Sequence, residues 1–450
     1  MGNIKLLFLC PKICLYVGEK TAFNNRVIAI GLFGKAQFLM DMVDTSKETG
    51  KGMLAVYKKF DHLRIGGYIQ PQFQVAQANG AKTFEGTDFS AQVSNRFMLR
   101  RSRVRIDYVH FEPKNKPGVQ IVFQFDANER GFTIRDVWGR VFENKYKLFS
   151  FTTGMFARPF GYEINLSSSD RESPERGRMS QLHTKSERDL GAMLSFDVRK
   201  KEHPLKHLKI DAGIFNGQGI NVANEFDNTK DFIGRISLKP LHINKMVTLS
   251  AGASVLSGGL QNNTKYIYTT TTQGSIKKIV VDSSVANIGT RAPRKYYGAD
   301  VQVKISNGKN CFTELRGEWI SGIQTGTANS AETPVALLAG TDGFHQRKFN
   351  GAYFYFLQHL FSPFHQLIIK YDWYDPNTKV KGKEIGTAGS NFTGANIKYS
   401  TLGAGYIYYI SDNIKLVLYY ARVKNEKTLL TGFTADVKDD VFTCRLQFRF

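Results

Sequence analysis

The sequence predicts an all-β fold: a transmembrane antiparallel β-barrel of about 16 strands, with short periplasmic turns and long extracellular loops. Three observations predict it. Apolar and polar residues alternate along many segments, and the connections between these segments alternate between short and long. After the N-terminal leader, no run of about eighteen apolar residues could form a membrane helix.

Composition agrees with this fold class. The chain has 450 residues, 42% of them hydrophobic, with 34 Phe and 20 Tyr but only 12 Pro. Abundant aromatic residues and scarce proline suit long paired strands that end at membrane interfaces. The formal charge of +22 indicates an anionic partner, which could be nucleic acid, lipopolysaccharide phosphate or a small anion in a pore. A large soluble β-protein is the alternative that composition leaves open.

The last segment shows the alternation most clearly. One face carries Phe442, Cys444, Leu446, Phe448 and Phe450, and the other carries Thr443, Arg445, Gln447 and Arg449. One face suits lipid and the other suits water, because successive strand residues face opposite sides. The chain ends on an aromatic residue, and we expect Phe448 and Phe450 to form the C-terminal signal that barrel assembly machinery recognises.

Similar segments predict the whole barrel. We expect strands at residues 62–77, 96–110, 118–126, 132–142, 148–157, 189–199, 207–215, 229–238, 246–257, 297–306, 311–320, 349–359, 365–374, 398–409, 414–424 and 438–450. Residues 1–45 are expected to be a leader or signal-like segment with an uncertain true start, residues 46–60 a periplasmic segment, and residues 61–450 the barrel. The connection 258–296 is expected to be one of the long polar loops, and the connection 127–131 is short where a long loop is due.

The densest basic cluster lies on the second predicted strand, at Arg100, Arg101, Arg103 and Arg105. Val104, Ile106 and Tyr108 define the apolar side, so Arg101, Arg103 and Arg105 should face the lumen and Arg100 should lie near the strand end or at a bulge. An arginine facing lipid at mid-membrane would cost roughly 2 to 4 kcal/mol. Stacked guanidinium groups can replace part of an anion's hydration.

The same alternation places further cations in the lumen. These are Arg235, Lys304, Arg316, Lys370, Lys415, Arg445 and Arg449. Acids on the same faces could neutralise them as lumenal salt bridges, namely Asp126, Asp197, Asp211, Asp300, Glu314, Glu318 and Asp372. For any single lumenal arginine this structural role is as plausible as anion binding, but we expect the run at 101–105 to be harder to neutralise.

The connection 158–188 is the expected constriction, since it is long, charged and early in the barrel, and we expect it to fold inward. Its cations include Arg158, Arg171, Arg176, Arg178 and Arg188, and its acids are Glu163, Asp170, Glu172, Glu175 and Glu187. The net charge is near zero, so selectivity would have to come from geometry. A solvated surface loop is the alternative.

Several stretches resemble the phosphate-selective porin O and P family of outer-membrane channels. They are residues 97–105 (FMLRRSRVR), 134–138 (IRDVW), 154–161 (GMFARPFG) with 167–169 (SSS), and 230–235 (KDFIGR). The resemblance implies a sixteen-stranded barrel, usually trimeric, with an arginine ladder that leads anions to a constriction. Arg100, Arg101 and Arg103 match the basic strand motif, and Arg158 matches the loop entry. No counterpart of the family's central lysine can be located.

We therefore expect an anion-favouring porin in the outer membrane of a Gram-negative bacterium. It should pass phosphate-like anions, form a homotrimer, contact outer-membrane lipid and lipopolysaccharide, and bind no nucleic acid. A general or sugar-passing porin and a structural or adhesive barrel are the alternatives. No catalytic motif, cofactor or metal site is expected, because no histidine pairs with a nucleophile and an orienting acid, and Cys10, Cys14, Cys311 and Cys444 lack metal-ligand spacing.

Overall fold

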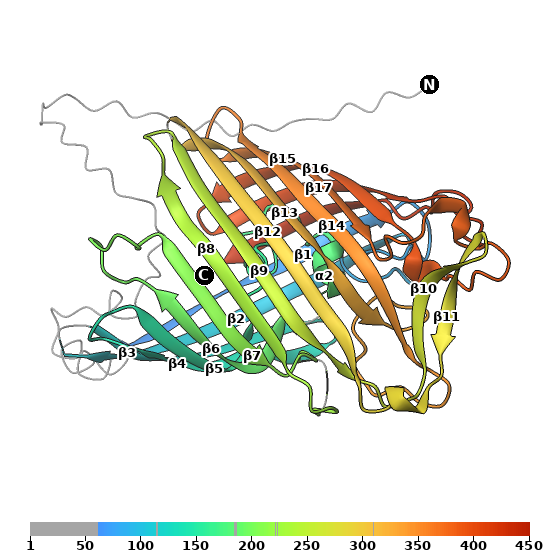
Figure 1. Cartoon of the computed structure of the whole chain (residues 1–450). Helices are drawn as coiled ribbons and strands as arrows, with labels where there is room; N and C mark the ends of the chain where they lie inside the picture. The colour runs from blue at the N-terminus through green and yellow to red at the C-terminus, as the bar shows by residue number, and fades with distance from the viewer. Residues whose placement is uncertain (1–61, 114–115, 184–186, 221, 223, 309) are drawn as a thin grey trace, which may run out of the picture. The chain divides into compact units, whose positions relative to one another are not determined.

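Sixteen antiparallel strands close into a barrel (Figure 1). The computed structural model describes residues 62–113, 116–183, 187–220, 222, 224–308 and 310–450. The predicted leader and periplasmic segment at 1–60 lie outside these residues. No helix in the described part is long and apolar enough to cross a membrane. The closed antiparallel barrel confirms the predicted fold class.

The strands follow one another around the barrel in chain order. Those of the first half are β1 (Leu63–Ala76), β2 (Asn95–Glu112), β3 (Lys116–Asn128), β4 (Gly131–Phe142), β5 (Phe149–Ala157), β6 (Arg188–Asp197), β7 (Leu208–Phe215), β8 (Asp231–His242) and β9 (Val247–Gln261). Those of the second half are β12 (Arg291–Gly308), β13 (Cys311–Gly326), β14 (Phe344–His359), β15 (His365–Asp375), β16 (Tyr399–Ser411), β17 (Ile414–Asn425) and β18 (Val441–Arg449). Short turns lie at one end of the barrel, here called the turn end, and longer loops lie at the other, the loop end.

The barrel closes where the first strand meets the last. β1 pairs antiparallel with β18, with Gln72 opposite Arg445 and Ile69 opposite Phe448. Beyond β18, the backbone of Phe450 exchanges two hydrogen bonds of 3.0 Å with that of Gly67. No barrel strand in the described part is left with a free edge, which membrane-spanning sheets require.

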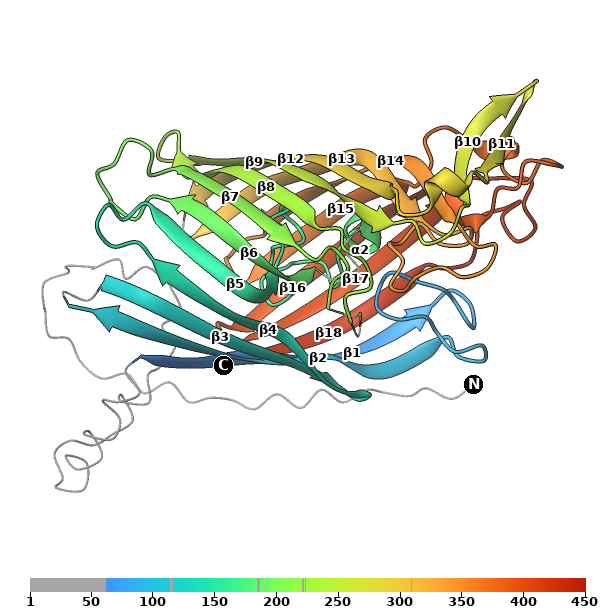
Figure 2. The same cartoon turned by 60° about the horizontal axis from the view of Figure 1, so that its bottom comes forward.

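The loop 258–296 departs from the prediction. It contains a hairpin of β10 (Ile267–Gln273) and β11 (Ile276–Asp282), followed by the 3-10 helix η3 (Val285–Asn287). The hairpin projects from the loop end and joins the sheet through a three-residue parallel pairing of β10 with β14 (Figure 2). The segment is predicted as a long polar loop because it is rich in Gly, Ser, Thr and Asn, and its Thr-rich stretch has no apolar alternation that would indicate a strand. Two further 3-10 helices, η4 (Gly382–Glu384) and η5 (Gly394–Asn396), lie in the loop before β16.

Polar and apolar side chains alternate between the lumenal and the outer face of the strands, as predicted. In β18, Thr443, Arg445 and Gln447 are buried, whereas Phe442 is exposed on the outer face. Exposed apolar residues recur around the barrel, including Ile236 on β8, Leu315 on β13 and Leu402 on β16. This apolar exterior is the surface that a bilayer core requires.

Two register shifts place extra cations on the inner face. Gln70 lies opposite Arg101 but Pro71 lies opposite Leu99, so Arg100 is an extra residue in β2. A second shift makes Arg135 an extra residue in β4. A β-bulge allows two consecutive side chains to point to the same side, because the alternation is interrupted there. The bulge expected near Arg100 is thus present.

Candidate functional site

In its described residues, 158–183 and 187, the loop between β5 and β6, here called the inward loop, lies inside the barrel. It carries the short helix α2 (Arg178–His183), which both cartoon views place among the strands (Figures 1 and 2). Ser168 Oγ lies 2.5 Å from the Tyr68 hydroxyl of β1, and Lys415 Nζ of β17 donates to the Ser169 carbonyl at 2.7 Å. On β13, Glu318 accepts the backbone N–H groups of Tyr162 and Glu163 at 3.1 and 2.9 Å. The loop therefore contacts walls on different sides of the lumen.

One side of the inward loop is fixed by apolar packing. The His183 ring centroid lies 3.8 Å from that of Phe349, 5.0 Å from that of Tyr296 and 5.1 Å from that of Tyr374. Met179 is also buried among these residues. Burial lowers the pKa of His183 to about 3, so the imidazole is neutral near pH 7. This packing holds α2 against the wall formed by β12 to β15.

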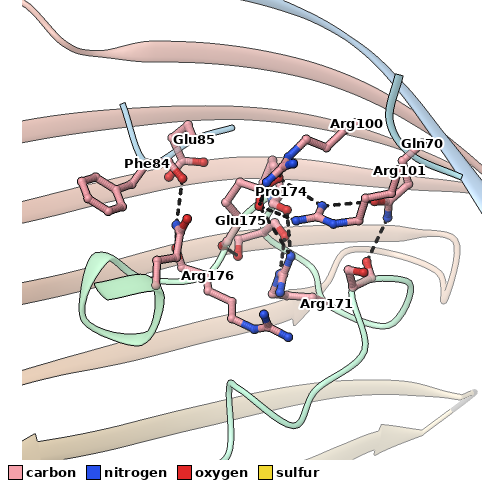
Figure 3. A network of polar contacts seen from close by, with 12 residues as sticks. Gln70, Phe84, Glu85, Arg100, Arg101, Arg171, Pro174, Glu175 and Arg176 are labelled. Carbon is pink, nitrogen blue, oxygen red and sulfur yellow. Dashed lines mark hydrogen bonds and ion pairs between the residues drawn. The ribbon is translucent and has the colours of Figure 1, made fainter. Parts of the chain in front are cut away.

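A carboxylate on the inward loop gathers the arginines on the facing wall (Figure 3). Glu175 forms ion pairs with Arg100 at 2.9 Å, Arg101 at 2.7 Å and Arg445 at 2.8 Å. The bulge at Arg100 lets two adjacent arginines of β2 reach the same carboxylate. Burial acts to raise the pKa of Glu175, but the three guanidinium groups outweigh it and hold this pKa well below 4.5. We call Glu175 and these three arginines the Glu175 clamp.

Two further loop acids bind lumenal cations. Glu163 forms an ion pair with Lys370 at 3.2 Å and accepts hydrogen bonds from the Tyr355 and Ser180 hydroxyls at 3.0 and 2.6 Å. Glu172 receives both terminal nitrogens of Arg316 at 2.7 and 2.9 Å. The acids of the inward loop are thus the counter-charges of wall cations.

The expectation that the run at 101–105 would be hard to neutralise is wrong. Arg101 is paired with Glu175, Arg103 with Asp126 at 2.6 Å, and Arg105 with Asp107 at 2.7 Å. Their carboxylates come from the inward loop, from β3 and from β2 itself. All three acids lie outside the basic stretch in the sequence. The stretch by itself therefore gives no sign that its arginines are paired.

The other predicted lumenal cations occupy varied surroundings. Arg235 pairs with Asp300 at 2.6 Å, and Arg316 also pairs with Glu314 at 2.5 Å. Near the turn end, Lys304 Nζ lies 3.7 Å from the Phe312 ring centroid, and the exposed Arg449 pairs with Asp170 at 3.0 Å.

The predicted cations of the inward loop mostly stabilise the loop. Arg171 donates to the Pro174 carbonyl at 3.1 Å, and Arg178 lies 3.6 Å from the Tyr399 ring centroid and 4.4 Å from that of Phe84. Arg158 is buried 3.9 Å from Asp189 at the loop entry. Arg176 forms an ion pair with Glu187 at 3.3 Å. Arg188, predicted as part of the loop, is instead the first residue of β6, where it pairs with Glu187 at 2.5 Å and with Asp136 at 3.2 Å.

Two cavities lie along the side of the inward loop that faces β2 to β4. The turn-side cavity has a volume of about 870 Å³ and the loop-side cavity about 1050 Å³. Arg103, Ser168 and Arg176 line both, so the two cavities adjoin at these three residues. Among the described residues, the lining of the turn-side cavity contains nine Arg or Lys and four Asp. Its walls therefore carry an excess of positive charge.

The sequence interpretation missed the lumenal face of β4. Asp136, Trp138 and Arg140 line the turn-side cavity, and the Arg140 guanidinium carbon lies 5.0 Å from the Trp138 ring centroid. These residues alternate with Val137, Gly139 and Val141, a signal that could have identified them. Gln70, Gln72 and Gln74 of β1 were also missed, although they alternate and are buried.

Comparisons with known proteins support the fold. Neither a family model nor a curated protein matches the chain. Among solved structures, the outer membrane channel DcaP of Acinetobacter baumannii matches with a TM-score of 0.51 and 12% identity, covering 86% of this chain and 97% of that one. OprB of Pseudomonas putida, in a high-pH structure, matches with a TM-score of 0.56 and 7% identity, covering 90% and 96%.

These identities establish the fold alone. The chain has the closed barrel fold of outer-membrane channels. Together with the apolar exterior, this fold places the protein in the outer membrane of a Gram-negative bacterium, as predicted. The resemblance to the phosphate-selective porin O and P family stays a prediction.

Proposed function

We propose that the protein is a non-enzymatic, anion-favouring diffusion channel. The observation that carries this proposal is the meeting of two polar cavities at Arg103, Ser168 and Arg176. Together they extend from lining residues near the loop end, such as Lys82, to lining residues near the turn end, such as Arg449. A solute would pass beside β2 to β4, because α2 packs against the opposite wall.

The charge of this route favours anions. Most of its arginines have carboxylate partners, so they do not form a ladder of unpaired cations. Among the described residues, the turn-side lining has nine basic and four acidic residues, and three of its cations pair with carboxylates outside the lining, Asp126, Glu187 and Asp300, so an excess of two positive charges is left. A guanidinium that already binds one carboxylate keeps further N–H donors, with which it can contact phosphate or carboxylate oxygens. We therefore propose moderate anion preference, with phosphate-like anions among the solutes and a homotrimer as the assembled form.

A general or sugar-passing porin remains the second candidate. The paired state of Arg100, Arg101, Arg103 and Arg105 favours it, because neutralised walls discriminate little between ions. Planar-bilayer recordings in a salt gradient separate the two candidates. An anion-favouring channel gives a reversal potential with the sign expected when chloride permeates faster than the cation. A general porin gives a reversal potential near zero. Bilayers that stay closed would support a structural or adhesive barrel.

The variant Arg103→Gln tests the proposed route. A unit charge about 8 Å away in water changes the energy of an ion by roughly 0.5 kcal/mol, with opposite signs for chloride and potassium, so the chloride-to-potassium permeability ratio should fall by a factor of about 5. Arg422→Gln is the matched control, because Arg422 lies on the exposed outer side of β17. If the two variants gave the same ratio, the route beside β2 would be refuted.

A further inference from the structure

Basic residues gather on the outer face of the barrel at the loop end of β14 to β17. Lys348 of β14, Lys398 just before β16, and Arg422 and Lys424 of β17 are exposed. The neighbouring loops add four exposed lysines, Lys379, Lys381, Lys383 and Lys427. We call these eight residues the outer basic patch. None of them lines either lumenal cavity, so the proposed route does not use them.

Strand geometry fixes the spacing of the central cations. Arg422 and Lys424 share the outer face two residues apart, which corresponds to about 7 Å along a strand. Lys424 lies opposite Ser400 of β16, so Lys398 occupies the diagonal position, at about 7 to 8 Å. Three cations are thus close enough to contact one or two phosphate groups together.

An aromatic surface lies directly next to these cations, toward the middle of the barrel. Phe354, Tyr371, Trp373 and Tyr420 are all exposed or partly exposed on the outer face. The ring centroids of Phe354 and Trp373 are 6.0 Å apart, and those of Tyr371 and Trp373 are 6.1 Å apart. Aromatic girdles mark the interface between acyl chains and head groups. The cations therefore lie at head-group level.

Nearby carboxylates are mostly engaged elsewhere. Glu426 accepts the backbone N–H groups of Gly382 and Lys398, and Glu384 pairs with Lys277. Asp440 accepts hydrogen bonds from the Tyr420 hydroxyl and the Val423 backbone. Within the described residues, no side chain of the outer basic patch forms an ion pair within 4.0 Å. Lys379 donates to the Thr270 carbonyl at 3.0 Å, but the charges of the central cations Lys398, Arg422 and Lys424 are available to a partner.

We infer that the outer basic patch binds the phosphorylated lipid A part of lipopolysaccharide. We choose lipid A on the ground of charge complementarity, because clustered Lys and Arg beside a membrane interface attract anionic head groups. Acyl chains would pack on the aromatic surface while phosphates contact Lys398, Arg422 and Lys424. A second copy of the chain would bring like charges together at this face. The inference does not depend on whether the barrel conducts.

The test uses the triple variant K398Q/R422Q/K424Q of the full chain. Native mass spectrometry would measure the lipopolysaccharide retained after purification. Titration with purified lipid A in detergent, with dephosphorylated lipid A in a parallel series, would measure affinity. Because each cation near an anionic surface contributes appreciably to binding, lipid A affinity should fall by about ten-fold or more. Dephosphorylated lipid A should bind the wild type weakly.

The matched control is K200Q/K201Q/K206Q, which removes three exposed lysines from the turn between β6 and β7, at the other end of the barrel. It should retain wild-type affinity. Unshifted migration of unheated samples on gels would show that all variants fold. Equal affinity of both triple variants would overturn the inference. So would binding that dephosphorylated lipid A reproduces, complete displacement by inorganic phosphate, or a patch-dependent change of oligomeric state without lipid A binding.

Discussion

At the scale of single residues, the charge of the lumen depends on which carboxylate pairs with each cation and on how deeply that pair is buried. Glu175 is buried and serves three arginines from two strands, whereas Asp170 of the same loop forms an exposed pair with Arg449. Removing one partner of a buried ion pair leaves an uncompensated charge, while exposed pairs contribute little. Loss of the Glu175 carboxylate should therefore lower the stability much more than loss of the Asp170 carboxylate.

We predict that Glu175→Gln destabilises the barrel by roughly 3 kcal/mol, because Arg100, Arg101 and Arg445 lose their shared counter-charge. It should also raise anion preference and increase conductance fluctuations as the inward loop loosens. Urea unfolding in lipid vesicles measures the first effect, and bilayer recording the others. Asp170→Asn is the control, with an expected loss below about 1 kcal/mol. Equal effects of the two substitutions would contradict the assignment.

Acidification should reproduce the loss of the Glu175 clamp. Because the folded-state pKa of Glu175 lies well below its ordinary value of 4.5, the clamp contributes fully to stability above 4.5. That contribution is lost as pH falls through the lower folded-state pKa. Wild-type conductance should thus be quiet from about pH 5 upward and noisy only well below pH 4.5. Noise that already rises near neutral pH would contradict this.

At the scale of elements, the barrel strands and the hairpin differ in what holds them. Each barrel strand pairs on both sides, whereas β10 and β11 pair with each other and join the sheet through three residues of β14. Their other contacts are with the loop before β16, such as the Lys277–Glu384 ion pair and the 3.0 Å bond from the Ile279 N–H to the Ser390 carbonyl. Tyr268 of β10 also stacks on His345, with 4.4 Å between ring centroids. The hairpin is therefore an accessory of the loop end.

We predict that replacing residues 265–284 with a short Gly-Ser linker leaves the barrel folded. The pairing of β9 with β12 spans Gln261 to Val247 and is independent of the hairpin. Resistance to unfolding in unheated samples on gels should stay within the wild-type range. Shortening the inward loop by removing residues 163–183 is the comparison, since it deletes four acids that pair with wall cations and should destabilise strongly. A hairpin deletion that prevents folding would contradict this prediction.

At the scale of the whole molecule, closure depends on the end of the chain. Phe450 follows β18, and its backbone N–H and carbonyl both bond to Gly67 of β1. Its side chain is largely exposed, so it adds little burial to the barrel. Backbone and side chain can therefore be tested separately.

We predict that Phe450→Ala lowers the amount of barrel inserted in the outer membrane without lowering the stability of the inserted fraction. This is the expectation if the ring is the assembly signal. Deletion of Phe450 should lower both, because it also removes two seam hydrogen bonds, each contributing about 1 kcal/mol. Membrane fractionation and urea unfolding measure the two quantities. Wild-type insertion of Phe450→Ala would show that the aromatic side chain carries no signal.

The sequence by itself determined the fold class, the sixteen barrel strands and the face of most side chains, because period-two alternation is a local property of consecutive residues. It correctly placed Arg445 and Gln447 inside and Phe448 outside. It indicated the bulge at Arg100, since an extra residue breaks the alternation. It did not identify the β10–β11 hairpin, whose Thr-rich strand carries no apolar alternation.

Only the tertiary structure decided which charges remain unbalanced in the lumen. Glu175 is 75 residues from Arg100 in sequence and 270 from Arg445, so the clamp is visible only when the inward loop and the barrel seam are in place. The same holds for Glu163 with Lys370 and for Glu172 with Arg316. Net charge is additive along a sequence, but electrostatic pairing falls off with distance in space, which only folding sets.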